Sequence, residues 1–182
     1  MPIRPWQLIT SEQVFDAGLF RVSRDRVRSP RTGREIDLSL VHMIDWLMVV
    51  PVTIEGTLVM VRQYRHGTRA PSLEVPGGLH DVSAQSPQQG AARELAEETG
   101  YGDGTISLLG VLSPQPALFS NRVHIFAARN VRRIAAPEPD SGEDIESVLI
   151  DREQIVARIT GGEITSAISV AALALARFNG FI

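Results

Sequence analysis

The sequence feature that most constrains the fold is a strong helix signal after a glycine-rich turn. Ser86 can cap the free amides at a helix start, Pro87 suits the first helical position, and Gln89 can complete a capping box. Gly100 suits the left-handed residue that follows a helix. The pattern therefore predicts a helix over residues 87–99. Its expected core-facing residues are Ala91, Ala92, Leu95 and Thr99.

This helix carries three carboxylates on one face. Glu94, Glu97 and Glu98 are spaced by three and four residues, so they repel one another by about a few tenths of a kcal/mol per pair. Arg93, which is expected to pair with Glu97 four residues later, only partly offsets this repulsion. A divalent cation would turn that repulsion into attraction, because Mg²⁺ binds carboxylate oxygens together with water and substrate phosphates. A solvated acidic face is the alternative interpretation. The glycine-rich turn upstream favours a cation site.

Residues 93–101, Arg-Glu-Leu-Ala-Glu-Glu-Thr-Gly-Tyr, resemble the second half of the Nudix box. This box is the signature of hydrolases that act on nucleoside diphosphates linked to another moiety. The first half departs from the pattern, because the glycine expected fourteen residues before Arg93 falls on Leu79. One residue is inserted after the available glycines, and the upstream Glu of the box is missing. The resemblance implies a site with Mg²⁺ or Mn²⁺.

The resemblance also assigns roles to the box residues. Glu94 and Glu98 match the principal metal ligands, and Glu97 assists them in binding and catalysis. The strand that leads into the box resembles that of ADP-ribose pyrophosphatases, in which the residue matching Glu74 faces the substrate and the carbonyl matching Gly77 binds metal.

Composition excludes several other classes of function. The chain has 182 residues, 43% of them hydrophobic, which is enough for one domain with a sizeable core. It has no Cys, which excludes disulfides and thiolate sites, and its net charge of -3 gives no general attraction to nucleic acid or acidic membranes. No signal peptide or membrane span is visible in the sequence. We therefore expect a cytoplasmic protein with no nucleic acid partner and no membrane, and the resemblance implies a small-molecule nucleoside diphosphate substrate.

The N-terminal part, residues 1–43, is expected to form an antiparallel β meander. Arg24, Arg26 and Arg28 alternate along one predicted strand, so one face of it is cationic. A solvated strand face is the simpler interpretation. By resemblance to ADP-ribose pyrophosphatases, the meander would stabilise a homodimer or present an Arg such as Arg28 to a diphosphate. The predicted strands cover residues 13–15, 19–28 and 34–43.

The remainder, residues 44–182, is expected to be the Nudix hydrolase domain. Apolar and β-branched runs predict strands at 46–52, 57–62, 106–112, 124–128 and 147–150, the first two as a central hairpin. Asp151 is expected to cap a helix over 152–159, and Thr165 or Ser166 a last helix ending at Phe178. The expected core positions of that helix are Ile168, Ala171, Ala172, Leu175 and Phe178. Together with the resemblance, this order implies an α/β fold, the Nudix α/β/α sandwich with a mixed central sheet.

Two further regions supply candidate side chains. Arg62 and Arg65 can hold phosphate oxygens through bidentate hydrogen bonds, and the resemblance favours Arg65 as the substrate contact. The alternative interpretation is a surface loop with ordinary exposed Arg residues. The acidic loop after residue 137 resembles one in which a Glu activates water. Glu143 is the first candidate for that base and Glu146 the second. His124, at a strand start, is interpreted as structural, with acid or base catalysis as the alternative.

The expected reaction is metal-assisted hydrolysis of a P–O–P anhydride. The substrate is ADP-ribose, giving AMP and ribose 5-phosphate, or a nucleotide sugar such as GDP-mannose, giving a nucleoside monophosphate and a sugar 1-phosphate. The box cannot separate these, because variable loops bind base and sugar. A non-catalytic Nudix-like sensor is the alternative, although no box carboxylate of the helix is lost. Few aromatic residues, 5%, disfavour a nucleic-acid-cap hydrolase.

Overall fold

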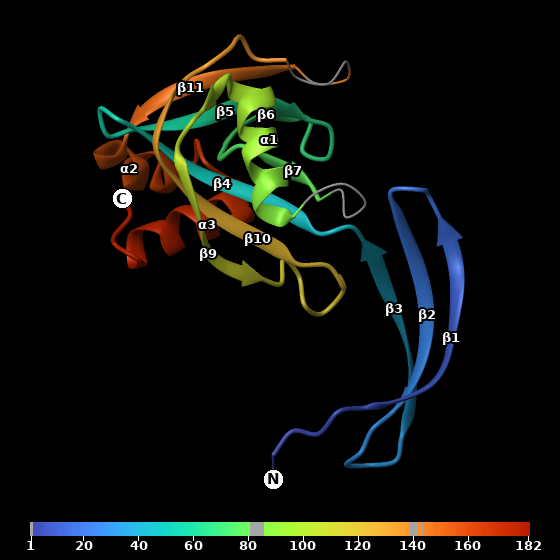
Figure 1. Ribbon diagram of the computed structural model, residues 1–182. Coiled ribbons are helices and arrows are strands. Elements are labelled where there is room, and N and C mark those ends of the chain that lie inside the picture. Colours follow the sequence, from blue (N-terminus) through green and yellow to red (C-terminus); the bar gives the residue numbers. More distant parts are fainter. Residues whose placement is uncertain (1, 81–85, 139–141, 143) are drawn as a thin grey trace. The chain divides into compact units, whose positions relative to one another are not determined.

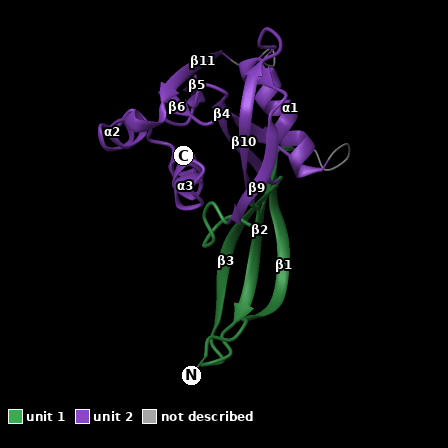
Figure 2. Cartoon of the chain, turned by 60° about the vertical axis from the view of Figure 1, so that its left-hand side comes forward, with its two compact units in different colours: residues 1–44, 113–122 green, residues 45–112, 123–182 purple. Residues whose placement is uncertain are grey.

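The computed structural model describes residues 2–80, 86–138, 142 and 144–182. It divides into two compact units, coloured separately in Figure 2. The first unit contains residues 1–44 and 113–122, and the second contains residues 45–112 and 123–182. None of the described helices is both long and apolar enough to cross a bilayer.

The first unit is built on a three-stranded antiparallel sheet, as the sequence predicted. The strands are β1 (Gln7–Asp16), β2 (Phe20–Arg28) and β3 (Glu35–Met43), in that order. The first strand begins six residues earlier than predicted, because its side chains are almost all exposed and show no clear apolar alternation. Segment 113–122 joins this unit through Val41, whose amide donates to the Leu118 carbonyl at 2.8 Å.

The second unit contains an eight-stranded mixed sheet (Figure 1). Its central order is β11-β5-β4-β10-β8, with β6 paired to β5, β7 to β4 and β9 to β10. β4 and β10 run parallel, and the other pairs are antiparallel. The strands are β4 (Trp46–Thr53), β5 (Thr57–Arg65), β6 (Ala70–Glu74), β7 (Gly77–Leu79), β8 (Tyr101–Gly102), β9 (Thr105–Leu112), β10 (Val123–Arg133) and β11 (Ile145–Asp151).

The predicted hairpin of β4 and β5 is paired only where the two strands meet at their turn. The register contains a single pair, Val52 with Leu58. Beyond it, β6 pairs with β5, and β7 pairs with β4 at residues 46–48. The amide of Val49 donates to the Pro76 carbonyl at 2.9 Å, which fixes the crossing from β6 to β7. The chain over residues 70–79 therefore lies between two strands that the sequence indicated as neighbours.

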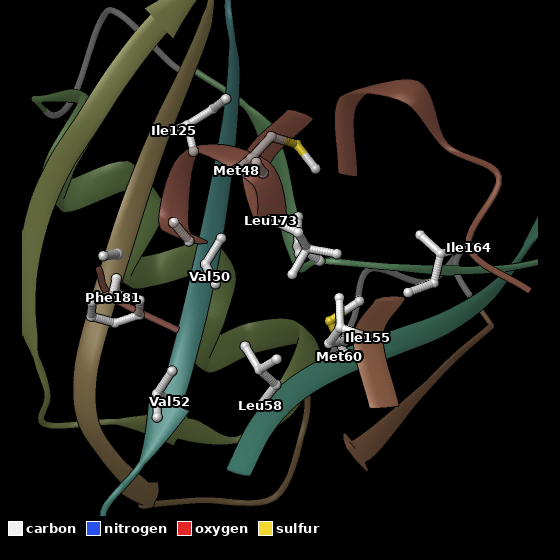
Figure 3. Packing of buried hydrophobic residues seen from close by; sticks show 14 of the residues in the cluster. Met48, Val50, Val52, Leu58, Met60, Ile125, Ile155, Ile164, Leu173 and Phe181 are labelled. Carbon is white, nitrogen blue, oxygen red and sulfur yellow. The ribbon is translucent and has the colours of Figure 1, made fainter. Parts of the chain in front are cut away.

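Helices cover both faces of this sheet, which confirms the predicted sandwich. α1 (Pro87–Thr99) packs its buried Ala91 and Leu95 with Leu47, Val49 and Phe126 on one face. The other face packs against α2 (Ile155–Thr160) and α3 (Ala167–Phe178). Figure 3 shows that second core. Its labelled members are Met48, Val50, Val52, Leu58, Met60, Ile125, Ile155, Ile164, Leu173 and Phe181.

The predicted ends of α1 are confirmed. The Ser86 hydroxyl accepts from the Gln89 amide, and the Gln89 side chain accepts from the Ser86 amide at 3.0 Å, which completes the capping box. Gly100 ends the helix in the left-handed region, with φ 73°. Two local signals, one at each end, therefore fix where this helix lies along the chain.

The C-terminal helices differ from the prediction in two respects. Asp151 makes no capping hydrogen bond, and residues Arg152–Gln154 form a 3₁₀ turn before the short α2. The buried stripe of α3 is also rotated from the predicted one, and Phe178 is 82% exposed. The stripe contains Ser169, Ala172, Leu173 and Ala176. Within this stripe the Ser169 hydroxyl accepts from the Val75 amide at 3.3 Å, so a polar residue occupies a buried position.

Candidate active site

Two of the predicted metal ligands lie against the glycines of β7. Glu98 is buried, 4% exposed, and its Oε2 accepts from the Gly77 amide at 2.9 Å. Glu94 lies one helical turn earlier, beside Gly78, where a Cβ atom would stand 2.6 Å from its Cδ. Glu98 thus lies on the buried side of α1, which the sequence had assigned to apolar residues and Thr99 alone. The two carboxylates face the same short strand.

Arg93 organises the carboxylates at this end of α1. Its guanidinium contacts Glu94 Oε1 at 2.6 Å and Glu97 Oε2 at 2.5 Å. Partial burial alone would lower the pKa of Arg93, but the charges of Glu94 and Glu97 and their hydrogen bonds outweigh burial and raise it. Arg93 therefore stays charged, and by binding both acids it offsets the repulsion between them. The sequence had paired Arg93 only with Glu97, four residues on, and missed the contact with its neighbour.

These residues fit a hard divalent cation that keeps part of its water. Among the described residues, no group of three or more His, Cys, Asp or Glu side chains is gathered closely enough to hold an ion alone. Mg²⁺ needs no such group, because it usually takes one or two carboxylates and completes its shell with water and substrate phosphates. Glu94 and Glu98 supply two carboxylates, and Gly78 leaves the space that the Glu94 side chain fills.

The two glycines of β7 predict different effects of the same substitution. In Gly77→Ala the new methyl would meet the Leu47 carbonyl of β4, so we expect a loss of about 1–3 kcal/mol in unfolding free energy. In Gly78→Ala the methyl meets only the end of the flexible Glu94 side chain, which can move away. We expect that variant to stay folded and to bind divalent cation more weakly. Urea unfolding measures the stability of the two variants, and isothermal titration with Mg²⁺ measures their cation binding. Equal losses of unfolding free energy in both variants would contradict this prediction.

Arg65 and Glu74 form a bidentate ion pair on the sheet face that α1 covers. Arg65 Nε lies 2.8 Å from Glu74 Oε1, and Nη2 lies 2.9 Å from Oε2. Glu74 pairs with Val61 in the β-sheet register, and Gln63 pairs with Ser72, so this face carries a buried polar strip. Burial would raise the pKa of Glu74, but the hydrogen bonds and charge of Arg65, with a contribution from Ser72, lower it overall.

This shift predicts how stability depends on pH. Because the folded pKa of Glu74 lies below its ordinary value of 4.5, the unfolded chain takes up the proton first as the pH falls. The stabilisation is complete above that value and is lost as the pH falls through the folded pKa. We expect the difference in unfolding free energy between the wild type and Glu74→Gln to shrink as the pH falls from neutral through 4.5 and below. Urea unfolding across this range measures it. A difference that does not change with pH would contradict the assignment.

The structure does not bring Arg62 and Glu146 to the α1 face. They are register partners on β5 and β11, and Arg62 contacts Glu146 and Glu163, each at 3.3 Å. Arg62 also pairs across the sheet with Leu73, which belongs to the core under α3. Since successive side chains of a strand point to opposite faces, Arg62 and Arg65 point to opposite faces of the sheet.

Two other predicted residues, Arg28 and Glu143, are not placed at the site by the structure. Arg28 belongs to the first unit, where its guanidinium contacts Glu35 at 2.6 Å. Glu143, the first candidate for the base, lies outside the described residues. The segment that contains it is bounded by two contacts, because the Glu138 amide donates to the Glu97 carbonyl of α1 at 2.8 Å and Ile145 pairs with Gln63 of β5.

His124 has a structural partner that the sequence did not indicate. Its Nε2 lies 2.9 Å from Asp45 Oδ2, and its ring lies 6.1 Å from that of His80. The His80 amide donates to the Asp45 carbonyl at 2.9 Å. These three residues come from the loop before β4, the start of β10 and the end of β7, and the pairing of β4 with both β10 and β7 brings them together. No local signal in the sequence indicates that pairing.

Comparisons with known proteins show what the chain is similar to in sequence and fold. The family model described as NUDIX domain matches residues 46–169. An ADP-ribose pyrophosphatase of Mycobacterium tuberculosis is 30% identical over 167 residues, 91% of this chain and 80% of that protein. One of Bacillus subtilis is 26% identical, covering 87% and 85%. A solved structure named ADP compounds hydrolase has the same fold, with a TM-score of 0.85 and 23% sequence identity. The match covers 100% of this chain and 100% of that one.

Proposed function

The chain belongs to the NUDIX family, and from that membership we propose that it hydrolyses the pyrophosphate bond of ADP-ribose or a related nucleoside diphosphate sugar. The products are a nucleoside monophosphate and a sugar phosphate. The observation that carries this proposal is the placement of Glu94 and Glu98 against the glycines of β7. Family membership and the ADP-ribose pyrophosphatase relatives make the chain a Nudix pyrophosphatase.

Nudix hydrolases generally use divalent metal ions, and we propose Mg²⁺, with Mn²⁺ as a substitute. Glu94 and Glu98 would hold it, with Glu97 and the Gly77 carbonyl as further ligands. The ion supplies neutralisation of the diphosphate charge and a lower pKa for bound water. The argument for Mg²⁺ is the donor set, which consists of oxygen atoms from a few carboxylates.

The chain's own residues divide the remaining tasks. Arg65 binds the diphosphate, because a guanidinium suits phosphate oxygens and its side chain is 45% exposed. Glu143 takes the proton from the water that attacks phosphorus, the P–O bond to the leaving phosphate breaks, and that phosphate leaves as an anion. Arg93 keeps Glu94 and Glu97 in place. Arg62 and Glu146, on the other face of the sheet, take no part.

ADP-ribose is the preferred candidate substrate because of the relatives from two bacteria that carry that name. The alternative, a Nudix-like protein that binds nucleotide sugars without cleaving them, would require loss of a carboxylate at the site. Glu94, Glu97 and Glu98 are all present on α1.

A substrate panel tests the proposal. The protein is incubated with Mg²⁺ and, separately, ADP-ribose, GDP-mannose and UDP-glucose, and phosphate is measured after treatment with a phosphatase that cleaves only monoesters. We expect the fastest release from ADP-ribose. If phosphate is released from GDP-mannose alone, the substrate is that nucleotide sugar and not ADP-ribose. If no compound releases phosphate, the protein is not a hydrolase of this class.

We also propose that the chain forms a homodimer through the first unit. Its three-stranded sheet exposes large apolar side chains to solvent, among them Leu8 at 56%, Val14 at 44% and Phe15 at 53%. Exposed apolar groups in one small sheet favour association with a second copy. Light scattering after size exclusion measures the mass, and a monomer at all concentrations would exclude the dimer.

A further inference from the structure

Arg65 binds both oxygens of the Glu74 carboxylate. The two distances are 2.8 and 2.9 Å, and the Glu74 side chain is only 6% exposed. A buried carboxylate is stable only when its oxygens are paired, and the bidentate fork of Arg supplies two parallel hydrogen bonds. Glu74 is therefore a poor candidate for direct contact with a diphosphate, whose charge has the same sign.

The Arg65 side chain, unlike that of Glu74, is partly exposed to solvent. It is 45% exposed, although its Nε and Nη2 both donate to Glu74. Its backbone is also fixed, because its carbonyl accepts from the Arg69 amide at 2.8 Å at the end of β5. One edge of the guanidinium is thus held by the protein while the side chain still reaches solvent.

We propose that Glu74 is a positioning residue, which holds the Arg65 guanidinium in the orientation that binds the diphosphate of the substrate. The inference rests on the proposed function and replaces the earlier expectation that Glu74 itself contacts substrate. An Arg side chain loses much rotational freedom when it binds a ligand. Glu74 removes that freedom before the substrate arrives, so less is lost on binding.

Glu74→Gln tests the proposal, because Gln keeps the shape of the side chain and removes its charge. We expect KM for ADP-ribose to rise about 10- to 100-fold, the range found when a group that orients a ligand is removed. We expect kcat to fall much less, because Arg65 binds the diphosphate in the ground state and the transition state alike. Asp103→Asn is the matched control, since it removes an exposed carboxylate paired with Arg132 and should change neither constant.

A double-mutant cycle separates positioning from direct contact. In the Arg65→Met background, adding Glu74→Gln should change KM by less than about twofold, because the group that Glu74 acts through is already gone. If the fold-changes in KM caused by the two substitutions multiply in the double variant, Glu74 contacts the substrate itself, and the inference is overturned. Thermal unfolding shows whether each variant is folded.

A direct readout covers the case in which Arg65→Met does not fold. The Nε–H signal of Arg65 in a ¹H–¹⁵N NMR spectrum should be sharp in the wild type and broadened in Glu74→Gln. An unchanged signal would overturn the inference. Binding of the non-hydrolysable α,β-methylene analogue of ADP-ribose, measured by titration calorimetry with Mg²⁺, replaces KM if no panel compound is cleaved. Absence of cleavage would then exclude the proposed function, while the binding data still decide the role of Glu74.

Discussion

Glu98→Gln is expected to lower kcat/KM by about 10³-fold or more, because a bound metal ion contributes several kcal/mol to catalysis and each 1.36 kcal/mol is a factor of ten. The variant should stay folded. The Glu98 oxygen that accepts from the Gly77 amide at 2.9 Å can be replaced by the carbonyl oxygen of Gln, so the helix keeps its contact with β7. The loss should therefore come from weaker cation binding.

Titration of kcat/KM against Mg²⁺ concentration, with thermal unfolding alongside, measures this effect. Glu153→Gln is the control, since Glu153 is an exposed Glu whose weak contact with Arg152 spans 3.8 Å. If Glu98→Gln turns over substrate at the wild-type rate at low Mg²⁺ concentration, Glu98 is not a metal ligand. A large fall in melting temperature would instead mean that the carboxylate is needed for the fold.

The sequence predicted those parts of the fold that short-range signals determine. The ends of α1 follow from Ser86, Pro87 and Gly100, which act within one turn of the helix and need no distant partner. The buried face of α3 did not follow, because Ala occurs on every side of that helix. Ser169 belongs to the buried stripe only because Val75, ninety-four residues earlier, approaches it.

In the candidate site, too, the sequence predicts what local spacing determines and misses what depends on distant contacts. The spacing of Glu94 and Glu98 places both on one side of a helix, and the structure has them there. Arg62 and Arg65 look alike in the sequence, yet the pleat of β5 sends them to opposite faces of the sheet. Which face carries the site depends on where α1 packs, and the sequence of β5 does not contain that information.

Glu143→Gln is expected to lower kcat by about 10²- to 10⁴-fold with little change in KM, the usual effect of removing a general base. The segment that contains Glu143 is bounded on one side by the bond from the Glu138 amide to Glu97 of α1 and on the other by the start of β11 at Ile145. Both contacts lie on elements that carry the site. Glu143 itself lies outside the described residues, so its assignment as the base rests on the resemblance of this acidic loop to that of ADP-ribose pyrophosphatases.

Glu146→Gln is the matched comparison, because it changes an acid three residues further along the same segment. Glu146 is 70% exposed and contacts Arg62 across β5 and β11, on the face opposite to α1. Its replacement should leave kcat within about twofold of the wild type, since an exposed ion pair contributes little. Stopped assays with ADP-ribose over a range of pH compare the two variants. Loss of the acidic limb of the kcat profile in Glu143→Gln supports the base assignment. The same loss in Glu146→Gln alone would reverse it, and would require β11 to turn its first residues toward α1 when substrate binds.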